Sequence, residues 1–192
     1  MYEVELKFPV ADQPALHRRL VTLATRFYAP VDQIDRYFNH PCRDFARTDE
    51  ALRLRHDGDG VAITWKGPRI DATTKTRREI ELPLTVGLPE GGDVADRDAS
   101  TIARWTELLE ALGFRPVATV AKQRRPAHVL WQGMEIDVAL DSVAGVGEFL
   151  ELEILASEAD VPLARACLES LARELGCGLP ERRSYLELLL ES

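Results

Sequence analysis

The chain has 192 residues, of which 45% are hydrophobic and 29% charged, and its formal net charge is −8 at pH 7. This length suits one domain, residues 1–192, with a substantial core. No apolar run approaches the roughly 20 residues of a membrane helix, and the negative charge argues against nucleic-acid binding across the outer surface.

The cysteines and the N-terminus point to the cytoplasm. Cys42, Cys167 and Cys177 are an odd count without a CxxC pair, so we expect neither a disulfide framework nor a zinc knuckle. Glu3 and Glu5 interrupt any apolar region at the start of the chain, which has no signal-peptide layout. We therefore expect a cytoplasmic protein that does not associate with membranes.

The first strand, expected over Met1–Phe8, carries a charged face. Side chains alternate between the faces of a strand, so Glu3, Glu5 and Lys7 share one face while Val4, Leu6 and Phe8 lie on the other. An exposed strand has this pattern too, but the same alternation recurs along the chain.

Hydrophobic spacing predicts four helices and eight or nine strands. The helices are expected at Ala11–Arg26, Ala99–Leu112, Val161–Leu175 and Glu181–Leu190, the first capped by Asp12. The later strands are expected at Val31–Phe38, Ala51–His56, Val61–Lys66, Thr76–Pro83, Val117–Arg124, Ala127–Trp131, Met134–Asp141 and Gly147–Leu155. Residues 57–60 (DGDG) predict a hairpin turn, residues 67–74 a loop before Lys75, and Leu84–Asp96 a mobile surface loop.

The charged strand faces predict a closed barrel. They bear too many charges for a dry core, while the apolar faces need a cover that the helices can supply. A barrel with a charged interior satisfies both demands and leaves no open edge. The expected fold is therefore α+β, a closed antiparallel eight-stranded tunnel barrel with helices packed outside.

The predicted interior combines cations with paired acids. The candidate cations are Lys7, Arg53, Arg55, Lys66, Arg77, Lys122 and Arg124, and the acids are Glu3, Glu5, Asp35, Glu79, Glu81, Asp137, Asp141, Glu151 and Glu153. Guanidinium groups bind phosphate oxygens in pairs, and neighbouring carboxylates suit Mg²⁺ or Mn²⁺. This combination predicts a site for a triphosphate and a divalent metal. Isolated cross-strand salt bridges remain the alternative, most of all for Arg77 with Glu79 and Glu81.

These motifs resemble the CYTH superfamily, the triphosphate tunnel metalloenzymes, over nearly the whole chain. The resemblance starts at Glu3-x-Glu5-x-Lys7. It continues through Gln33-x-Asp35-x-Tyr37-Phe38, Leu52-Arg53-Leu54-Arg55, Thr64-x-Lys66, Arg77-x-Glu79-x-Glu81, Lys122-x-Arg124, Asp141, Gly147-x-Phe149-x-Glu151-x-Glu153 and Ser184-Tyr185.

The resemblance implies a role for each of these positions. It implies metal ligands at Glu3, Glu5, Glu151 and Glu153, and catalytic roles for Glu5, Lys7, Lys66 and Asp141. It implies triphosphate binding by Lys7, Arg53, Arg55, Lys66, Arg77, Lys122, Arg124 and Arg183, with Glu79, Glu81, Asp35 and Tyr37 in support. Some members carry a lysine before Ser184-Tyr185, where this chain has Arg182 and Arg183, so a proton-transfer lysine is not expected there.

The stretch from His40 to Arg53 looks more like the class IV adenylyl cyclase branch than the thiamine triphosphatases. The expected activity is conversion of ATP into cyclic AMP and pyrophosphate with Mg²⁺ or Mn²⁺. The alternatives are an inorganic, thiamine or nucleoside triphosphatase and a non-catalytic polyphosphate or nucleotide sensor. The resemblance also allows a homodimer.

Overall fold

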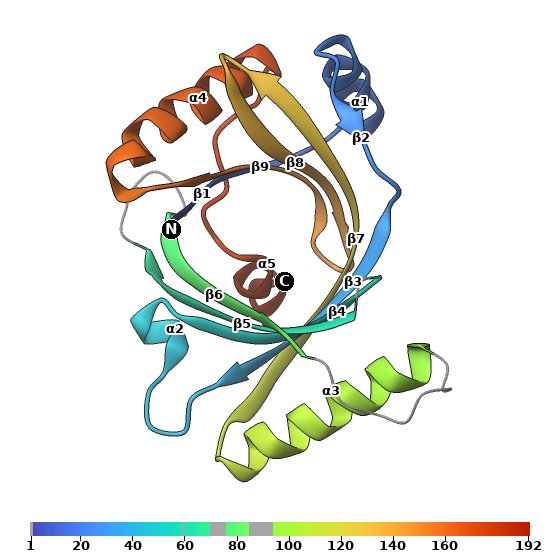
Figure 1. Cartoon of the computed structure of the whole chain (residues 1–192), viewed down its shortest axis with the longest axis vertical. Coiled ribbons are helices and arrows are strands. Elements are labelled where there is room, and N and C mark those ends of the chain that lie inside the picture. The colour runs from blue at the N-terminus through green and yellow to red at the C-terminus, as the bar shows by residue number, and fades with distance from the viewer. Residues whose placement is uncertain (1, 59, 70–75, 85–93) are drawn as a thin grey trace. The chain divides into compact units, whose positions relative to one another are not determined.

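A computed structural model of the chain describes residues 2–58, 60–69, 76–84 and 94–192 (Figure 1). The strands are β1 (Tyr2–Pro9), β2 (Arg26–Phe27), β3 (Val31–Asn39), β4 (Ala51–Asp57), β5 (Gly60–Arg69), β6 (Arg77–Pro83), β7 (Arg115–Trp131), β8 (Met134–Val143) and β9 (Gly147–Ala156). The α-helices are α1 (Gln13–Thr22), α2 (Phe45–Thr48), α3 (Val94–Ala111), α4 (Val161–Glu174) and α5 (Tyr185–Glu191), with a 3₁₀ turn at Glu158–Asp160.

Hydrogen bonding between the strands closes the sheet. The strand order is β2-β7-β3-β4-β5-β6-β1-β9-β8, and β7 also pairs with β8. Eight strands therefore form a closed antiparallel barrel, and β2 is an extra strand beside β7. The expected α+β class, with a barrel and helices outside it, is confirmed. None of the helices in the described ranges combines the length and the apolar character needed to cross a membrane.

The chain forms two compact units. The first comprises residues 1–31, 69–78 and 122–192, and the second comprises residues 32–68 and 79–121. Strands β6 and β7 each contribute residues to both units.

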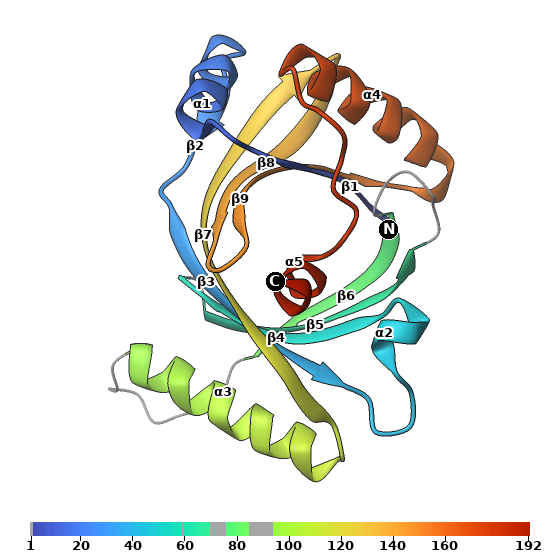
Figure 2. The same cartoon turned by 180° about the vertical axis from the view of Figure 1, so that it is seen from behind.

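The core of the first unit lies on the apolar face of β1, β8 and β9. Val4 and Leu6 of β1 pack in one buried cluster with Leu20 of α1 and with Leu168 and Leu171 of α4. The side chains of β1 are buried on both of its faces. Figure 2 shows α1 and α4 beside these strands, with α5 on their other side. The helices cover the apolar face, so the charged residues of β1 occupy the opposite face.

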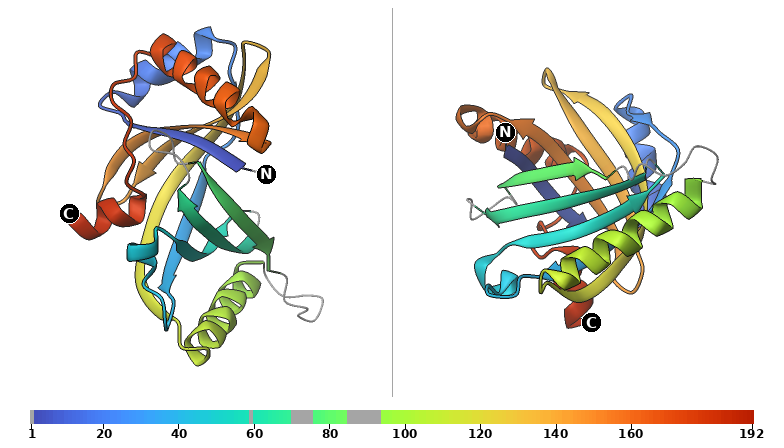
Figure 3. Two further views of the ribbon diagram at one scale, coloured as in Figure 1. Left: turned by 90° about the vertical axis from the view of Figure 1, so that its left-hand side faces the viewer. Right: turned by 60° about the horizontal axis from the view of Figure 1, so that its bottom comes forward.

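The second unit has a smaller core under α3. Leu52 and Leu54 of β4 pack with Phe38 of β3, Phe45 of α2 and Leu109 of α3. The right-hand view of Figure 3 shows α3 running alongside β4. The face of β4 that carries Arg53 and Arg55 is therefore turned away from this core, because strand side chains alternate.

Two strands that the sequence predicts separately form one continuous strand in the structure, β7. The sequence predicts a break between Arg124 and Ala127, but β7 runs without interruption from Arg115 to Trp131. Pro126 interrupts nothing because its carbonyl accepts a bond from Tyr28 N–H (3.0 Å), which places its nitrogen on the side away from β8. The missing N–H is therefore not needed by the β7–β8 ladder, in which Pro126 lies opposite Ala139.

Helix boundaries also differ from the predictions. The first helix stops at Thr22 because Ala24 adopts a left-handed conformation (φ 56°), after which β2 begins. The third starts at Val94, five residues earlier than expected, and part of the predicted loop before it (residues 85–93) lies outside the described residues. Of the loop predicted at residues 67–74, residues 67–69 belong to β5, which extends to Arg69. The rest of that loop and Lys75 lie outside the described residues.

Candidate active site

In the first unit, a buried carboxylate gathers two cations and a phenol. Asp141 is fully buried and accepts hydrogen bonds from Lys122 Nζ (3.0 Å), Arg124 Nε (2.8 Å) and the Tyr185 hydroxyl (3.0 Å). Arg124 lies opposite Asp141 in the β7–β8 ladder and also contacts Glu151 of β9. Burial alone would lower the pKa of the Arg124 guanidinium. The negative charges of Asp141 and Glu151 have the larger combined effect and hold this pKa well above the ordinary value. We call Asp141, Lys122, Arg124 and Tyr185 the Asp141 cluster.

Tyr185 is held as a neutral phenol. Burial is the main cause that raises its pKa well above the usual value, and Glu151 and Asp141 raise it further. The neutral hydroxyl donates to Asp141. Tyr185 is the first residue of α5, whose capping box is made by Ser184 and Glu187, so the start of this helix places the phenol.

Lys7 is the most deeply buried cation, with 1% of its surface exposed. Its ammonium donates to the carbonyl of Arg183 (2.5 Å) and lies 4.0 Å from the centroid of the Tyr185 ring. The β1–β9 pairing puts Lys7 opposite Glu151. The Lys7 ammonium therefore lies against a backbone carbonyl and an aromatic ring, on a strand position that pairs with a carboxylate residue.

The predicted metal ligands lie on the adjacent strands β1 and β9. Glu3 and Glu5 are each 8% exposed, and Glu5 lies directly opposite Glu153. Glu3 lies opposite Arg77 of β6, which is also buried. Like charges at directly opposite positions, with Cβ atoms roughly 4.5–5.5 Å apart, repel one another. A cation between the Glu5 and Glu153 carboxylates would offset that repulsion.

The donor set fits a hard divalent ion. Among the residues that the structure describes, no group of three or more acidic, histidine or cysteine side chains is gathered closely enough to enclose a metal. Mg²⁺ usually binds to one or two carboxylates and completes its shell with substrate phosphates and water. The Glu5–Glu153 pair, flanked by Glu3 and Glu151, matches that mode of binding.

In the second unit, Asp35 holds two arginines. Asp35 is 2% exposed, and Arg55, directly opposite on β4, binds it in a fork with two bonds of 2.7 Å. Arg53 donates to the same carboxylate (3.1 Å). Burial and the charge of Asp35 raise the pKa of Tyr37, which lies opposite Arg53, so its phenol stays neutral. Asp35 thus fixes both guanidinium groups on one strand face.

Lys66 continues this face on β5. Its ammonium forms a 2.6 Å ion pair with Glu79 of β6. Arg53 approaches Glu81 to 3.8 Å, and Glu81 also accepts a 2.8 Å bond from the Thr64 hydroxyl. The acids predicted to support the cations are therefore their partners, and Thr64, buried and opposite Arg53, joins them.

Two predicted residues are not brought together with these clusters by their side chains. Asp137, predicted among the interior acids, is 54% exposed and pairs with His128. The Arg183 guanidinium is 48% exposed and pairs with Glu181 and Glu191, while only its carbonyl meets Lys7. Sequence reasoning gave no site role to Tyr185 or to Arg69, which donates to the Arg182 carbonyl (2.7 Å) and contacts Glu187. The Ser184-x-x-Glu187 capping signal was the available indication, since it predicts that α5 starts at Tyr185.

The Glu181–Arg183 ion pair is expected to make the stability of the folded protein depend on pH. Its hydrogen bonds lower the pKa of Glu181 from 4.5 to about 2. Because the folded-state pKa is the lower one, the pair stabilises the native state above about pH 4.5, and this contribution is lost as the pH falls toward 2. We expect urea unfolding to show that the wild type is more stable than Glu181→Gln near neutral pH, with a difference that shrinks below about pH 4.5. A stability difference for Glu181→Gln that does not change with pH would contradict the prediction.

A closed antiparallel barrel with buried clusters of arginine, lysine and carboxylate side chains defines a class of proteins equipped to bind small polyanions. The chain belongs to the CYTH family, because the sequence model of the CYTH domain matches residues 1–185. Members of this family bind triphosphate substrates and generally depend on a divalent metal.

Individual relatives match the chain nearly end to end. A protein of Methanocaldococcus jannaschii named "Putative adenylate cyclase" is 33% identical over 193 residues, covering 98% of each chain. The structure of the PH1819 protein from Pyrococcus horikoshii is similar with a TM-score of 0.80 and 39% identity, again covering 98% of each chain. A protein of Hippeastrum named "Putative adenylyl cyclase", described as having a dominant triphosphatase activity, shares the fold with a TM-score of 0.62 and 18% identity, covering 99% of this chain and 95% of its own.

Proposed function

We propose that the chain is a metal-dependent enzyme that processes triphosphates, and that its reaction is that of a class IV adenylyl cyclase. The observation that carries the proposal is the Asp141 cluster, in which the buried Lys122 and the partly buried Arg124 are both held by hydrogen bonds to Asp141. The name of the 33% identical relative, which aligns over 98% of the chain, favours the cyclase reaction.

In this reaction the ribose 3′-oxygen of ATP attacks the α-phosphorus. A new O3′–P bond forms, the bond between the α-phosphorus and the β-bridging oxygen breaks, and the 3′-hydroxyl loses its proton. Pyrophosphate leaves with the bonding electrons, so negative charge accumulates on the leaving group. Stabilisation of that charge by fixed cations is the main task of the protein.

The cations suit this task because their acids orient them. Asp35 holds Arg53 and Arg55, Asp141 holds Lys122 and Arg124, and Glu79 holds Lys66. Guanidinium groups fixed in this way bind phosphate oxygens in pairs with little loss of conformational entropy. Lys7 and Arg77, both buried, add charge from β1 and β6. We propose phosphate-binding roles for Lys7, Arg77, Lys122 and Arg124 in the first unit. In the second unit we propose the same role for Arg53, Arg55 and Lys66, with Tyr37, Glu79 and Glu81 in support.

Glu5 and Glu153, with Glu3 and Glu151, would hold the metal. A bound Mg²⁺ or Mn²⁺ would polarise phosphate oxygens and make the nucleophile more acidic. The role of these carboxylates is to provide hard oxygen ligands on two paired strands. Pure anion binding would not need such an acidic pair, which weighs against a non-catalytic sensor.

A triphosphatase is the second candidate. The Hippeastrum protein bears a cyclase name but is described as having a dominant triphosphatase activity, so the fold alone does not separate the two reactions. The cations described above serve both, because water can replace the 3′-hydroxyl as nucleophile.

Product analysis separates the candidates. The purified chain is incubated with ATP or with tripolyphosphate, each with Mg²⁺ and with Mn²⁺, and the products are separated by chromatography. Cyclic AMP and pyrophosphate in equal amounts support the cyclase, and orthophosphate without cyclic AMP supports the triphosphatase. Saturable binding of ATP without turnover would leave the sensor and contradict the enzymatic proposal.

A variant at Arg55 tests whether the cations of the second unit bind phosphate. We expect Arg55→Ala to weaken the binding of tripolyphosphate about 10- to 100-fold, because a paired guanidinium–phosphate contact is lost. Isothermal titration calorimetry measures the affinity. Arg47→Ala, which changes an exposed arginine of α2, should leave it unaltered. Equal affinities for the wild type and Arg55→Ala would remove Arg55 from the site.

A further inference from the structure

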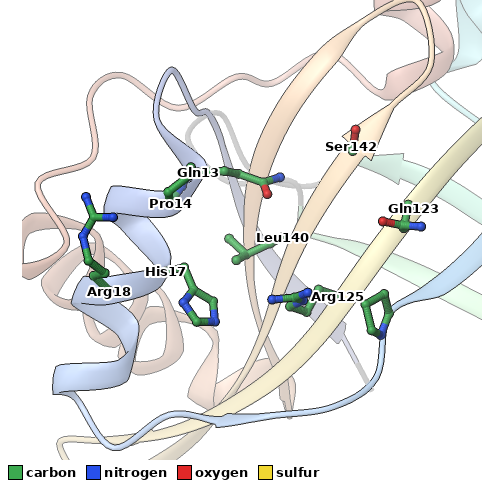
Figure 4. Close-up of a pocket in the computed structure, with 9 residues that line it drawn as sticks. Gln13, Pro14, His17, Arg18, Gln123, Arg125, Leu140 and Ser142 are labelled. Carbon is green, nitrogen blue, oxygen red and sulfur yellow. The ribbon is translucent and has the colours of Figure 1, made fainter.

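The first unit contains a cavity that none of the assigned residues explains. It has a volume of about 380 Å³ and is lined by residues of α1, β7 and β8 and by Pro30. Figure 4 shows His17 of α1 and Arg125 of β7 pointing into the same space, with Leu140 between them and Gln13 on the next turn of α1.

The cavity lies on the opposite side of β7 and β8 from the Asp141 cluster. Gln123 and Arg125 line it, and they alternate along β7 with Lys122 and Arg124. Successive side chains of a strand point to opposite faces. On β8, Leu140 and Ser142 likewise flank Asp141, so a ligand in this cavity would be separated from the cluster by the sheet.

The polar lining of the cavity is cationic. No carboxylate is among its lining residues, and Arg125 has no acidic partner within the described ranges. Arg18 lies at the rim, with its side chain directed away in Figure 4. Glu148, the neighbouring acid, accepts bonds from Gln13 and from Ser142 (2.7 Å). In a chain with net charge −8, an exposed arginine in a cavity without acids favours an anionic ligand.

The size and the apolar wall limit the kind of anion. A space of about 380 Å³ falls within the roughly 300–1,000 Å³ of small-molecule sites and exceeds what an inorganic phosphate needs. Leu140, Pro14 and Pro30 supply apolar surface, and the lining also includes the planar His17 ring, whose centroid lies 4.4 Å from that of Phe27. We propose that this cavity is a second binding site, which takes a phosphate monoester of a small organic molecule, with the phosphate on Arg125 and the organic part against Leu140 and His17.

AMP is a suitable probe because it joins a phosphate monoester to a flat ring. Isothermal titration calorimetry is carried out with AMP, adenosine and inorganic phosphate, each in the presence of saturating tripolyphosphate to occupy any triphosphate site. We expect saturable binding of AMP, with adenosine and phosphate each at least about tenfold weaker. Arg125→Gln should weaken AMP about tenfold or more, and His17→Ala should weaken it severalfold.

The controls separate this site from the proposed active site. Arg173→Gln, an exposed arginine of α4, should bind AMP like the wild type, and Arg125→Gln should bind tripolyphosphate unchanged. AMP binding that tripolyphosphate abolishes, or that survives in Arg125→Gln, would overturn the proposal, as would no saturable binding up to about 10 mM. Because the AMP titration needs no turnover, failure of the proposed function would leave this test intact.

Discussion

Replacing Asp141 with asparagine is expected to lower the free energy of unfolding by about 3 to 5 kcal/mol, because it removes one side of a buried ion pair. Asp141 is fully buried, and Lys122, Arg124 and Tyr185 all donate to it. Without the carboxylate, Lys122 would be a buried cation that has lost this partner. We also expect turnover of triphosphate to fall by about 100-fold or more, because the cations would no longer be held in position.

Asp137 offers a matched control for this variant. It lies on β8 four residues before Asp141, its side chain is 54% exposed, and it contacts His128 at the surface. Asp137→Asn should change the unfolding free energy by less than about 1 kcal/mol. Urea unfolding followed by circular dichroism measures both variants. Equal, small effects for the two would contradict a central role for Asp141 in the cluster.

Glu5→Gln is expected to lower metal-dependent turnover by about 100-fold or more while leaving the protein folded. The substitution keeps the size of the side chain and removes the charge that faces Glu153. Loss of the repulsion between these carboxylates should keep the unfolding free energy within about 1 kcal/mol of the wild-type value, or raise it. The loss of turnover in Glu5→Gln should therefore come from a slower catalytic reaction rather than from unfolding of the protein.

Titration of activity with Mg²⁺ and Mn²⁺ gives a sharper measure. If Glu5 is a metal ligand, the half-activating concentration should rise in Glu5→Gln. Glu135→Gln on β8, which changes an exposed carboxylate, should leave both turnover and metal activation unchanged. An unaltered metal requirement in Glu5→Gln would exclude Glu5 from the metal site and with it the Glu5–Glu153 pair.

Strand periodicity was a strong guide to the charged face and a weak guide to strand ends. The alternation of Glu3, Glu5 and Lys7 with apolar residues correctly predicted burial of the charged face of β1. Pro126 was misleading, because whether a proline interrupts a ladder depends on which side of the strand its nitrogen faces. The two-residue strand β2 was missed as well, since it carries no period and exists only through its pairing with β7.

The spacing of residues along the sequence did not predict which distant side chains contact one another. The sequence identified Asp35 and Asp141 as acids near cations, but not that each would receive several donors from the neighbouring strand. Strand register decides this, by placing Arg55 opposite Asp35 and Arg124 opposite Asp141. The metal, the substrate and the reaction stay predictions that the experiments above address.

The sequence by itself determined the fold class and the set of charged residues, because alternation along each strand decides which side chains share a face. Only the tertiary structure decided which acid holds which cation, that the Tyr185 phenol donates to Asp141, and that the Arg183 guanidinium pairs with Glu181 and Glu191. Such contacts can join residues far apart in the sequence, and Tyr185 and Asp141 are 44 positions apart. They depend on strand register and on where α5 begins, which are set by packing of the whole chain rather than by local sequence.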